Sequence, residues 1–196
     1  MELNSVSVMN FSQLSTVCDG TILQLIKDRS LKDMIIDSRK AMLFEEAVFF
    51  AIAGDRHDGH SYISELYQKG IRQFVVEKTI EVRTLPDANI LLVHSSIHAL
   101  QKLAHAHRSN FSIPVIGITG SNGKTIIKGW LYQLLLSDYH IVKNPGSYNS
   151  QLGVPLSVWQ MQSHHELGIF EAGISRPNEM EALQKVIQPT LGIFTN

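Results

Sequence analysis

The chain has 196 residues, of which 44% are hydrophobic and 18% charged, and its formal net charge is -1. This composition is typical of a globular chain that buries a core, and it excludes an intrinsically disordered one. Lysines and arginines stand singly between acidic residues, so we expect no surface for nucleic acid. The length allows one large domain or two modest ones.

The cysteine content and the N-terminal sequence indicate the expected cellular compartment. Cys18 is the single cysteine, so no disulfide can form within the chain and a reducing compartment is expected. Residues 1–5 lack the basic start and the long apolar run of a signal peptide. No apolar stretch reaches the ~20 residues that cross a bilayer. We therefore expect a cytoplasmic protein without membrane insertion.

In the first half of the chain, short apolar runs alternate with amphipathic segments. Helices are predicted at residues 11–17, from Asp58 to Gly70, and from Ser95 or Ser96 to Arg108. Strands are predicted at residues 21–26, 34–37, 48–52, 73–77 and 90–93. We assign residues 1–110 to a small mixed α/β domain that ends in the polar residues 108–110.

The second half, residues 111–196, shows a more regular alternation. Strands are predicted at residues 115–119, 140–143, 167–171 and 191–195. Helices are predicted at residues 124–137, at 154–161, and from Pro177 or Asn178, with Glu181 as a capping acid. Near-continuously apolar strands between amphipathic helices favour a parallel sheet covered on both faces. The sequence ends on a strand, so this second α/β domain is expected to be incomplete.

The helix predicted from Lys124 has a wide apolar stripe. Its members are Ile126, Ile127, Trp130, Leu131, Leu134 and Leu135. We expect this stripe to pack on the sheet.

The strongest local signal is a glycine-rich turn between a buried strand and a helix. Residues 117–125 read Gly-Ile-Thr-Gly-Ser-Asn-Gly-Lys-Thr. Glycines let backbone N–H groups turn toward phosphate oxygens, and the helix N-terminus adds its positive end. The expected contacts with the phosphates of ATP come from Gly120, Ser121, Asn122, Gly123, Lys124 and Thr125. The general Walker spacing would place its first glycine at Ile118, so the loop departs from that pattern.

An acidic residue follows another strand of the same predicted sheet. Glu171 ends the apolar run 167–171, which places it at the carboxyl edge where ligands bind in parallel sheets. There it can complete a Mg²⁺ shell together with the Thr125 hydroxyl. A solvated strand-end acid is the alternative interpretation.

Four residues are candidates for substrate binding. Ser38 and Arg39 follow a buried strand, and a guanidinium fork suits a diphosphate; a polar turn capped by Asp37 is the alternative interpretation. Asn149 lies in a loop between two elements, where it serves either a ligand or the turn itself. From spacing alone, His60 belongs to a helix start capped by Asp58.

The nine histidines do not form a convincing zinc site. His94 and His98 have a helical spacing, but His94 precedes the expected N-cap, so the two need not share a face. No cysteine lies nearby, and no glutamate follows His94 as a metalloprotease motif requires. We expect no dedicated zinc site.

Several motifs in order resemble one family. The sequence Thr-Gly-Ser-Asn-Gly-Lys-Thr at 119–125 looks like the ATP loop of the Mur ligases, which include folylpolyglutamate synthase. The segment 144–156, Asn-Pro-Gly-Ser-Tyr-Asn-Ser-Gln-Leu-Gly-Val-Pro-Leu, resembles the MurF type, and Glu-Ala-Gly at 171–173 matches the family's acidic Mg²⁺ ligand.

Asp-Ser-Arg at 37–39 and Asp-Gly-His at 58–60 resemble the uridine-nucleotide domain shared by the MurE and MurF types. Segments 148–151 and 157–161 look closest to the variant fused to an alanine racemase.

The resemblance implies an ATP- and Mg²⁺-dependent amide ligase of peptidoglycan synthesis. Its implied substrates are a UDP-N-acetylmuramoyl-peptide, bound through Ser38, Arg39, His60 and Asn149, and D-alanyl-D-alanine. Lys124, Thr125 and Glu171 match the family's catalytic phosphate and metal residues. The family's second-metal ligands and C-terminal ligase domain lie beyond residue 196, so this chain alone is expected to be an incomplete catalyst. A MurE-type or folylpolyglutamate-type ligase, or a non-catalytic nucleotide-binding fragment, are the alternatives.

Overall fold

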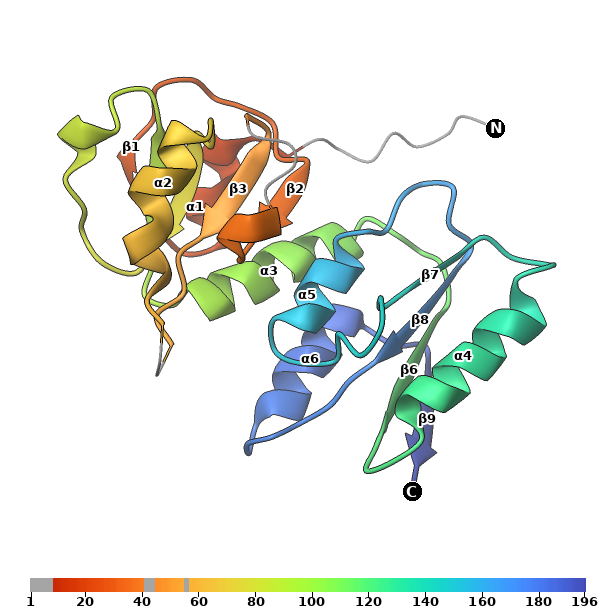
Figure 1. Ribbon diagram of the computed structural model, residues 1–196. Helices are drawn as coiled ribbons and strands as arrows, with labels where there is room; N and C mark the ends of the chain where they lie inside the picture. Colours follow the sequence, from red (N-terminus) through yellow and green to blue (C-terminus); the bar gives the residue numbers. More distant parts are fainter. Residues whose placement is uncertain (1–8, 41–44, 55–56) are drawn as a thin grey trace. The chain divides into compact units, whose positions relative to one another are not determined.

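The computed structural model describes residues 9–40, 45–54 and 57–196. The chain divides into two compact units, an N-terminal unit that ends at Leu103 and a C-terminal unit that starts at Ala104 (Figure 1). The boundary predicted after residue 110 lies just beyond the end of α3 (Ser96–Arg108). No helix among the described residues is both long and apolar enough to cross a membrane.

The N-terminal unit is built on a five-stranded mixed sheet with the order β1-β5-β4-β3-β2. The strands are β1 (Thr21–Gln24), β2 (Asp33–Ile35), β3 (Ala47–Phe50), β4 (Gln73–Val76) and β5 (Asn89–Leu92). Only β1 runs antiparallel to its neighbour. The helical segments are η1 (Phe11–Gln13), α1 (Leu14–Val17), η2 (Ser38–Lys40), η3 (Gly59–Tyr62), α2 (Ile63–Gln68), η4 (Val82–Thr84) and α3. The predicted mixed α/β class is confirmed.

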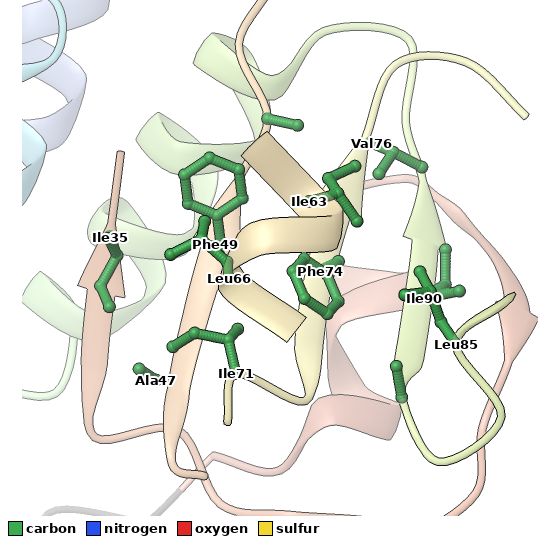
Figure 2. Packing of buried hydrophobic residues seen from close by; sticks show 12 residues of the cluster. Ile35, Ala47, Phe49, Ile63, Leu66, Ile71, Phe74, Val76, Leu85 and Ile90 are labelled. Atoms are coloured by element: carbon green, nitrogen blue, oxygen red, sulfur yellow. The ribbon is translucent and has the colours of Figure 1, made fainter. Parts of the chain in front are cut away.

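The core of this unit lies between the sheet and α2. Phe49 and Phe74 come from adjacent strands, and their rings meet edge to face with centroids 6.4 Å apart. Ile63 and Leu66 of α2 close the same cluster, as Figure 2 shows. Fully burying a side chain of this size contributes about 1.5–3 kcal/mol. This cluster therefore fixes the strands whose carboxyl ends carry the candidate residues Ser38, Arg39 and His60.

Cys18 is buried in the N-terminal unit. Its Sγ lies 3.5 Å from the carbonyl oxygen of Ala99. Burial raises the pKa of the thiol to about 12, while the nearby Lys102 opposes the shift. A protonated, buried thiol is a poor nucleophile, so Cys18 serves packing.

The C-terminal unit has a four-stranded, fully parallel sheet with the order β7-β8-β6-β9. The strands are β6 (Val115–Gly120), β7 (Ile141–Lys143), β8 (Leu167–Glu171) and β9 (Leu191–Thr195). The helices are α4 (Lys124–Leu135), α5 (Gly153–Val158) and α6 (Glu179–Ile187). Figure 1 shows α4 on one face of this sheet and α5 and α6 on the other. The predicted parallel sheet covered on both faces is confirmed.

The apolar stripe of α4 is narrower than predicted. Ile127, Leu131 and Leu135 pack against the sheet, whereas Ile126, Trp130 and Leu134 are 58%, 63% and 72% exposed. The six residues together span about half of the helix circumference, and a helix lying on a sheet buries a stripe of only about 100°. The outer three therefore remain exposed.

The start of α6 also differs from the prediction. Asn178 precedes the helix in a left-handed conformation and makes no side-chain cap. The carboxylate of Glu179, rather than that of Glu181, accepts hydrogen bonds from the backbone N–H groups of Ser175 and Arg176. Glu181 pairs instead with Lys185 one turn later. The turn before the helix folds back far enough to bring its N–H groups to the first acidic residue.

Candidate active site

A tight turn joins β6 to α4 at the carboxyl edge of the parallel sheet. Gly120 has a φ of 134° and Gly123 has a φ of 80°, conformations that side chains with a Cβ rarely adopt. A Cβ on Gly120 would lie 2.0 Å from the carbonyl oxygen of Thr195. The turn therefore depends on glycine because the end of β9 passes directly against it.

The end of β9 holds this loop in place. The Asn122 N–H donates to the carbonyl oxygen of Asn196 at 2.7 Å. The Thr195 hydroxyl lies 3.2 Å from the Thr119 carbonyl oxygen and 2.5 Å from that of Asn122. These contacts shape the loop without using its remaining N–H groups. The loop and the N-terminus of a twelve-residue helix thus form a backbone surface suited to an anion.

Two side chains with predicted roles extend from the first turn of α4. The Lys124 ammonium donates to the carbonyl oxygens of Gly120 at 2.6 Å and Ser121 at 3.3 Å, which places its charge over the loop. The Thr125 hydroxyl lies 3.5 Å from the Ser147 hydroxyl. Ser121, like Thr125, is exposed. The structure therefore brings the predicted phosphate-binding residues together on one accessible surface.

Glu171 ends β8 and lies in register with Ile118 of the neighbouring strand β6. Its side chain is 0% exposed, and neither carboxylate oxygen has a hydrogen-bond donor. A buried carboxylate without hydrogen-bond donors is costly, and its two oxygens fit a hard divalent cation. Mg²⁺ at nucleotide sites takes one or two protein oxygens together with phosphate and water, so Glu171 and Thr125 are a chemically suitable pair. Within the described residues, no group of three or more His, Cys, Asp and Glu side chains is arranged to hold a metal ion.

Sequence reasoning missed a buried lysine beside Glu171. The Lys128 ammonium lies 3.5 Å from the Glu171 carboxylate, and the two side chains are 4% and 0% exposed. This separation is an ion-pair distance and is long for a hydrogen bond. Burial lowers the pKa of Lys128, and the Glu171 charge opposes that shift. The helical register of Lys128 with Leu131 and Leu135, which pack against the sheet, indicates that it lies on the inner face of α4, but it does not identify its partner.

Asn144 is a second buried residue that the sequence did not single out. Its side-chain carbonyl accepts from the Glu171 backbone N–H at 2.7 Å, and its amide donates to the Tyr148 carbonyl at 2.6 Å. Pro145 and Gly146 make the segment look like an ordinary turn, so its sequence does not reveal this role. Asn144 joins the end of β8 to the loop that follows β7.

Asn149 lies in that same loop, next to the end of β8. Its carbonyl oxygen accepts from the Gly173 N–H at 2.8 Å. A Cβ on Gly173 would come within 3.1 Å of the Asn149 side chain. The loop therefore packs closely on residues 171–173, which brings Asn149 near the acidic residue.

In the N-terminal unit, Ser38 and Arg39 start η2 directly beyond the carboxyl end of β2. The Arg39 side chain is 86% exposed, and its Nε and Nη2 donate to the two Asp37 carboxylate oxygens at 2.9 and 2.8 Å. The hydrogen bonds that Arg39 donates to Asp37, together with the Asp37 charge, raise the pKa of the guanidinium. Asp37 thus fixes the direction of the Arg39 fork and leaves its other edge to solvent.

His60 is buried at the same edge of the sheet. Its Nε2 accepts from the Glu77 N–H at 3.0 Å, so Nδ1 carries the proton and donates to Asp58 at 2.6 Å. The hydrogen bonds that Asp58 accepts, first from Lys78 and then from His60, lower the pKa of this carboxyl. With both ring nitrogens engaged, His60 in this structure joins Asp58, at the start of η3, to the residue that follows β4.

Comparison with known proteins matches this arrangement along most of the chain. A family model described as "Mur ligase family, catalytic domain" matches residues 32–110. A second, described as "Mur ligase middle domain", matches residues 118–196 and includes the phosphate loop and Glu171. The chain belongs to the Mur ligase family. Its two units correspond to the N-terminal and middle domains of the MurF type.

Curated relatives carry the name UDP-N-acetylmuramoyl-tripeptide–D-alanyl-D-alanine ligase. The Bacillus subtilis protein is 32% identical over 82% of this chain and 34% of its own length. The Rickettsia prowazekii protein is 35% identical over 76% of this chain and 32% of its own length. The chain thus spans about a third of these curated relatives.

Two solved structures extend the comparison to the fold. MurF from Acinetobacter baumannii superposes with a TM-score of 0.86 at 26% identity, over 96% of this chain and 41% of that one. MurF ligase from Thermotoga maritima, solved in complex with ADP, gives a TM-score of 0.71 at 35% identity. That match covers 81% of this chain and 36% of the Thermotoga chain.

Proposed function

We propose that this chain binds ATP with Mg²⁺ and a UDP-N-acetylmuramoyl-peptide, as part of a ligase that adds D-alanyl-D-alanine to the peptide. The observation that carries the proposal is the phosphate loop lying beside a fully buried carboxylate whose oxygens have no hydrogen-bond donor. The names of the curated relatives and the ADP complex of the Thermotoga protein support it.

The proposed reaction proceeds in two steps. A carboxylate oxygen of the peptide substrate attacks the γ-phosphorus of ATP, which forms an acyl phosphate and releases ADP. The amine of D-alanyl-D-alanine then attacks the acyl carbon and releases inorganic phosphate. Charge builds up on the transferred phosphoryl oxygens, so the chemistry needs positive charge more than a protein nucleophile.

The residues of this chain supply that charge and hold the nucleotide. The N–H groups of the loop and the start of α4 bind phosphate oxygens, and the Lys124 ammonium moves from the loop carbonyls onto the β- and γ-phosphates. Thr125 and Glu171 would hold Mg²⁺, which would supply further positive charge to the phosphates. We propose that Asn149, on the loop beside Glu171, binds substrate.

Lys124→Ala is expected to weaken binding of ADP with Mg²⁺ roughly 10- to 100-fold, the size of a lost charge-assisted contact. Isothermal titration calorimetry on the 196-residue chain measures it. Lys185→Ala on α6 is the matched control, since it removes a lysine whose side chain is 64% exposed and pairs with Glu181 one turn earlier. Unchanged affinity in Lys124→Ala would remove this residue from phosphate binding.

We also propose that Ser38 and Arg39 bind the diphosphate of the UDP substrate, with His60 shaping the adjoining edge. Arg39→Ala is expected to weaken binding of UDP-N-acetylmuramic acid roughly 10-fold, because an exposed guanidinium fork is lost. Arg83→Ala, which removes another exposed arginine of the same unit, is the control. Equal affinities of the two variants would count against this contact.

A further inference from the structure

We propose that Lys128 is a positioning residue, which holds the Glu171 carboxylate and the loop around Asn144 in the geometry that a divalent cation requires. The inference rests on the proposed function, because it assigns Lys128 to the cation site of the same nucleotide-binding surface.

The fold places Lys128 and Glu171 on one face of the sheet. Side chains two residues apart on a strand share a face, so Glu171 points the same way as Leu167 and Ile169. Those two residues belong to the cluster that α4 covers. Lys128 lies one helical turn after Lys124, which brings its side chain below the phosphate loop and into this layer.

The Lys128 ammonium joins three elements of the C-terminal unit. It donates to the carbonyl oxygens of Asn144, at 3.0 Å, and of Gly146. It also lies 3.5 Å from Glu171 Oε2. Two of the three N–H donors of the ammonium serve these carbonyl oxygens, and its charge forms the ion pair with Glu171. Lys128 thus connects α4, the loop after β7 and the end of β8.

The arrangement leaves the carboxylate able to bind a cation. Lys128 lies 3.5 Å from Oε2, which is too long for a strong hydrogen bond, and neither carboxylate oxygen has a hydrogen-bond donor. The positive charge of Lys128 compensates the buried carboxylate before a cation arrives. Without it, a lone buried carboxylate would be neutralised or would move toward water, and its placement at the sheet edge would be lost.

Lys128 also positions neighbouring residues through the loop that follows β7. Asn144 binds the backbone of Glu171 through its side chain and Lys128 through its carbonyl oxygen. Ser147, further along this loop, lies 3.5 Å from the Thr125 hydroxyl. Lys128 therefore orders both proposed cation ligands, Glu171 directly and Thr125 through the loop.

The test is the gain in ADP affinity that Mg²⁺ produces. Calorimetry on the 196-residue chain measures the Kd of ADP with Mg²⁺ and with EDTA, and the ratio isolates the cation contribution. Lys128→Met is expected to reduce this ratio about 10- to 100-fold, as losing a partner behind a metal ligand does. Glu171→Gln is expected to reduce it as much, and the double variant Lys128→Met/Glu171→Gln no further. Lys128→Arg keeps the charge and is expected to recover part of the ratio.

If Lys128 only stabilises the fold, its replacement gives a different result. ADP binding would weaken equally with Mg²⁺ and with EDTA, the ratio of the two Kd values would stay unchanged, and the inference would be overturned. Lys128→Gln keeps a donor for the loop carbonyls, so the same comparison can be made on it if Lys128→Met does not fold. If the unmodified chain fails to bind ADP, the proposed function itself is wrong. If it binds and both neutral variants keep the full Mg²⁺ effect, only the role of Lys128 is wrong.

Discussion

Lys128→Met is expected to lower the free energy of unfolding of the C-terminal unit by about 3–5 kcal/mol, the cost of removing one partner of a buried ion pair. Methionine fills a similar volume, so the loss comes from charge and hydrogen bonding rather than from a cavity. Glu171 would keep a buried charge with no compensating partner, and the carbonyl oxygens of Asn144 and Gly146 would lose their donor. Urea unfolding followed by circular dichroism measures the effect.

The double variant Lys128→Met/Glu171→Met separates charge from packing. Replacing both partners of a buried pair by apolar side chains of similar volume is often neutral or stabilising. We expect the double variant to regain more than half of the stability lost in Lys128→Met, and to fall short of full recovery because the Asn144 carbonyl remains without its donor. A double variant as unstable as the single one would show that the carboxylate does not contribute to the loss. In that case Lys128 would act on the loop carbonyls alone.

The regular part of the fold could be predicted from the sequence because local pattern and tertiary burial agree there. The apolar run 167–171 is a strand, and all five of its residues are buried in the parallel sheet. The glycine-rich turn after β6 also formed where it was predicted, because few residues other than glycine tolerate its backbone conformation. Where one residue type is required by backbone geometry, the sequence alone is decisive.

The environment of the site was harder to predict because it depends on long-range partners. The helical register of Lys128 indicates the inner face of α4, but only the end of β8, 43 positions later in the sequence, supplies the carboxylate that explains the burial of its charge. Such features need distances between elements, which a pattern does not contain.

Gly120→Ala is expected to destabilise the C-terminal unit by roughly 2–5 kcal/mol and to abolish nucleotide binding by the loop. The φ of 134° at this position strains any residue with a Cβ, and that Cβ would also lie 2.0 Å from the Thr195 carbonyl oxygen and 2.4 Å from its hydroxyl. Because both atoms belong to the end of β9, relief of the clash requires β9 and the loop to move apart. The Thr195 contacts that shape the loop would then be lost. Urea unfolding and ADP titration of the same variant measure the two effects.

Gly129→Ala in α4 is the matched control, since it makes the same chemical change nine residues later. A Cβ at Gly129 has no neighbour within 4 Å, and the helix interior favours alanine over glycine. This variant is expected to be more stable than the unmodified chain by about 0.5–1 kcal/mol, with unchanged ADP affinity. The two variants are expected to change the free energy of unfolding in opposite directions. A general sensitivity of this unit to glycine replacement would instead make both variants less stable. If Gly120→Ala instead keeps its stability and its ADP affinity, β9 does not clamp the loop as the structure describes.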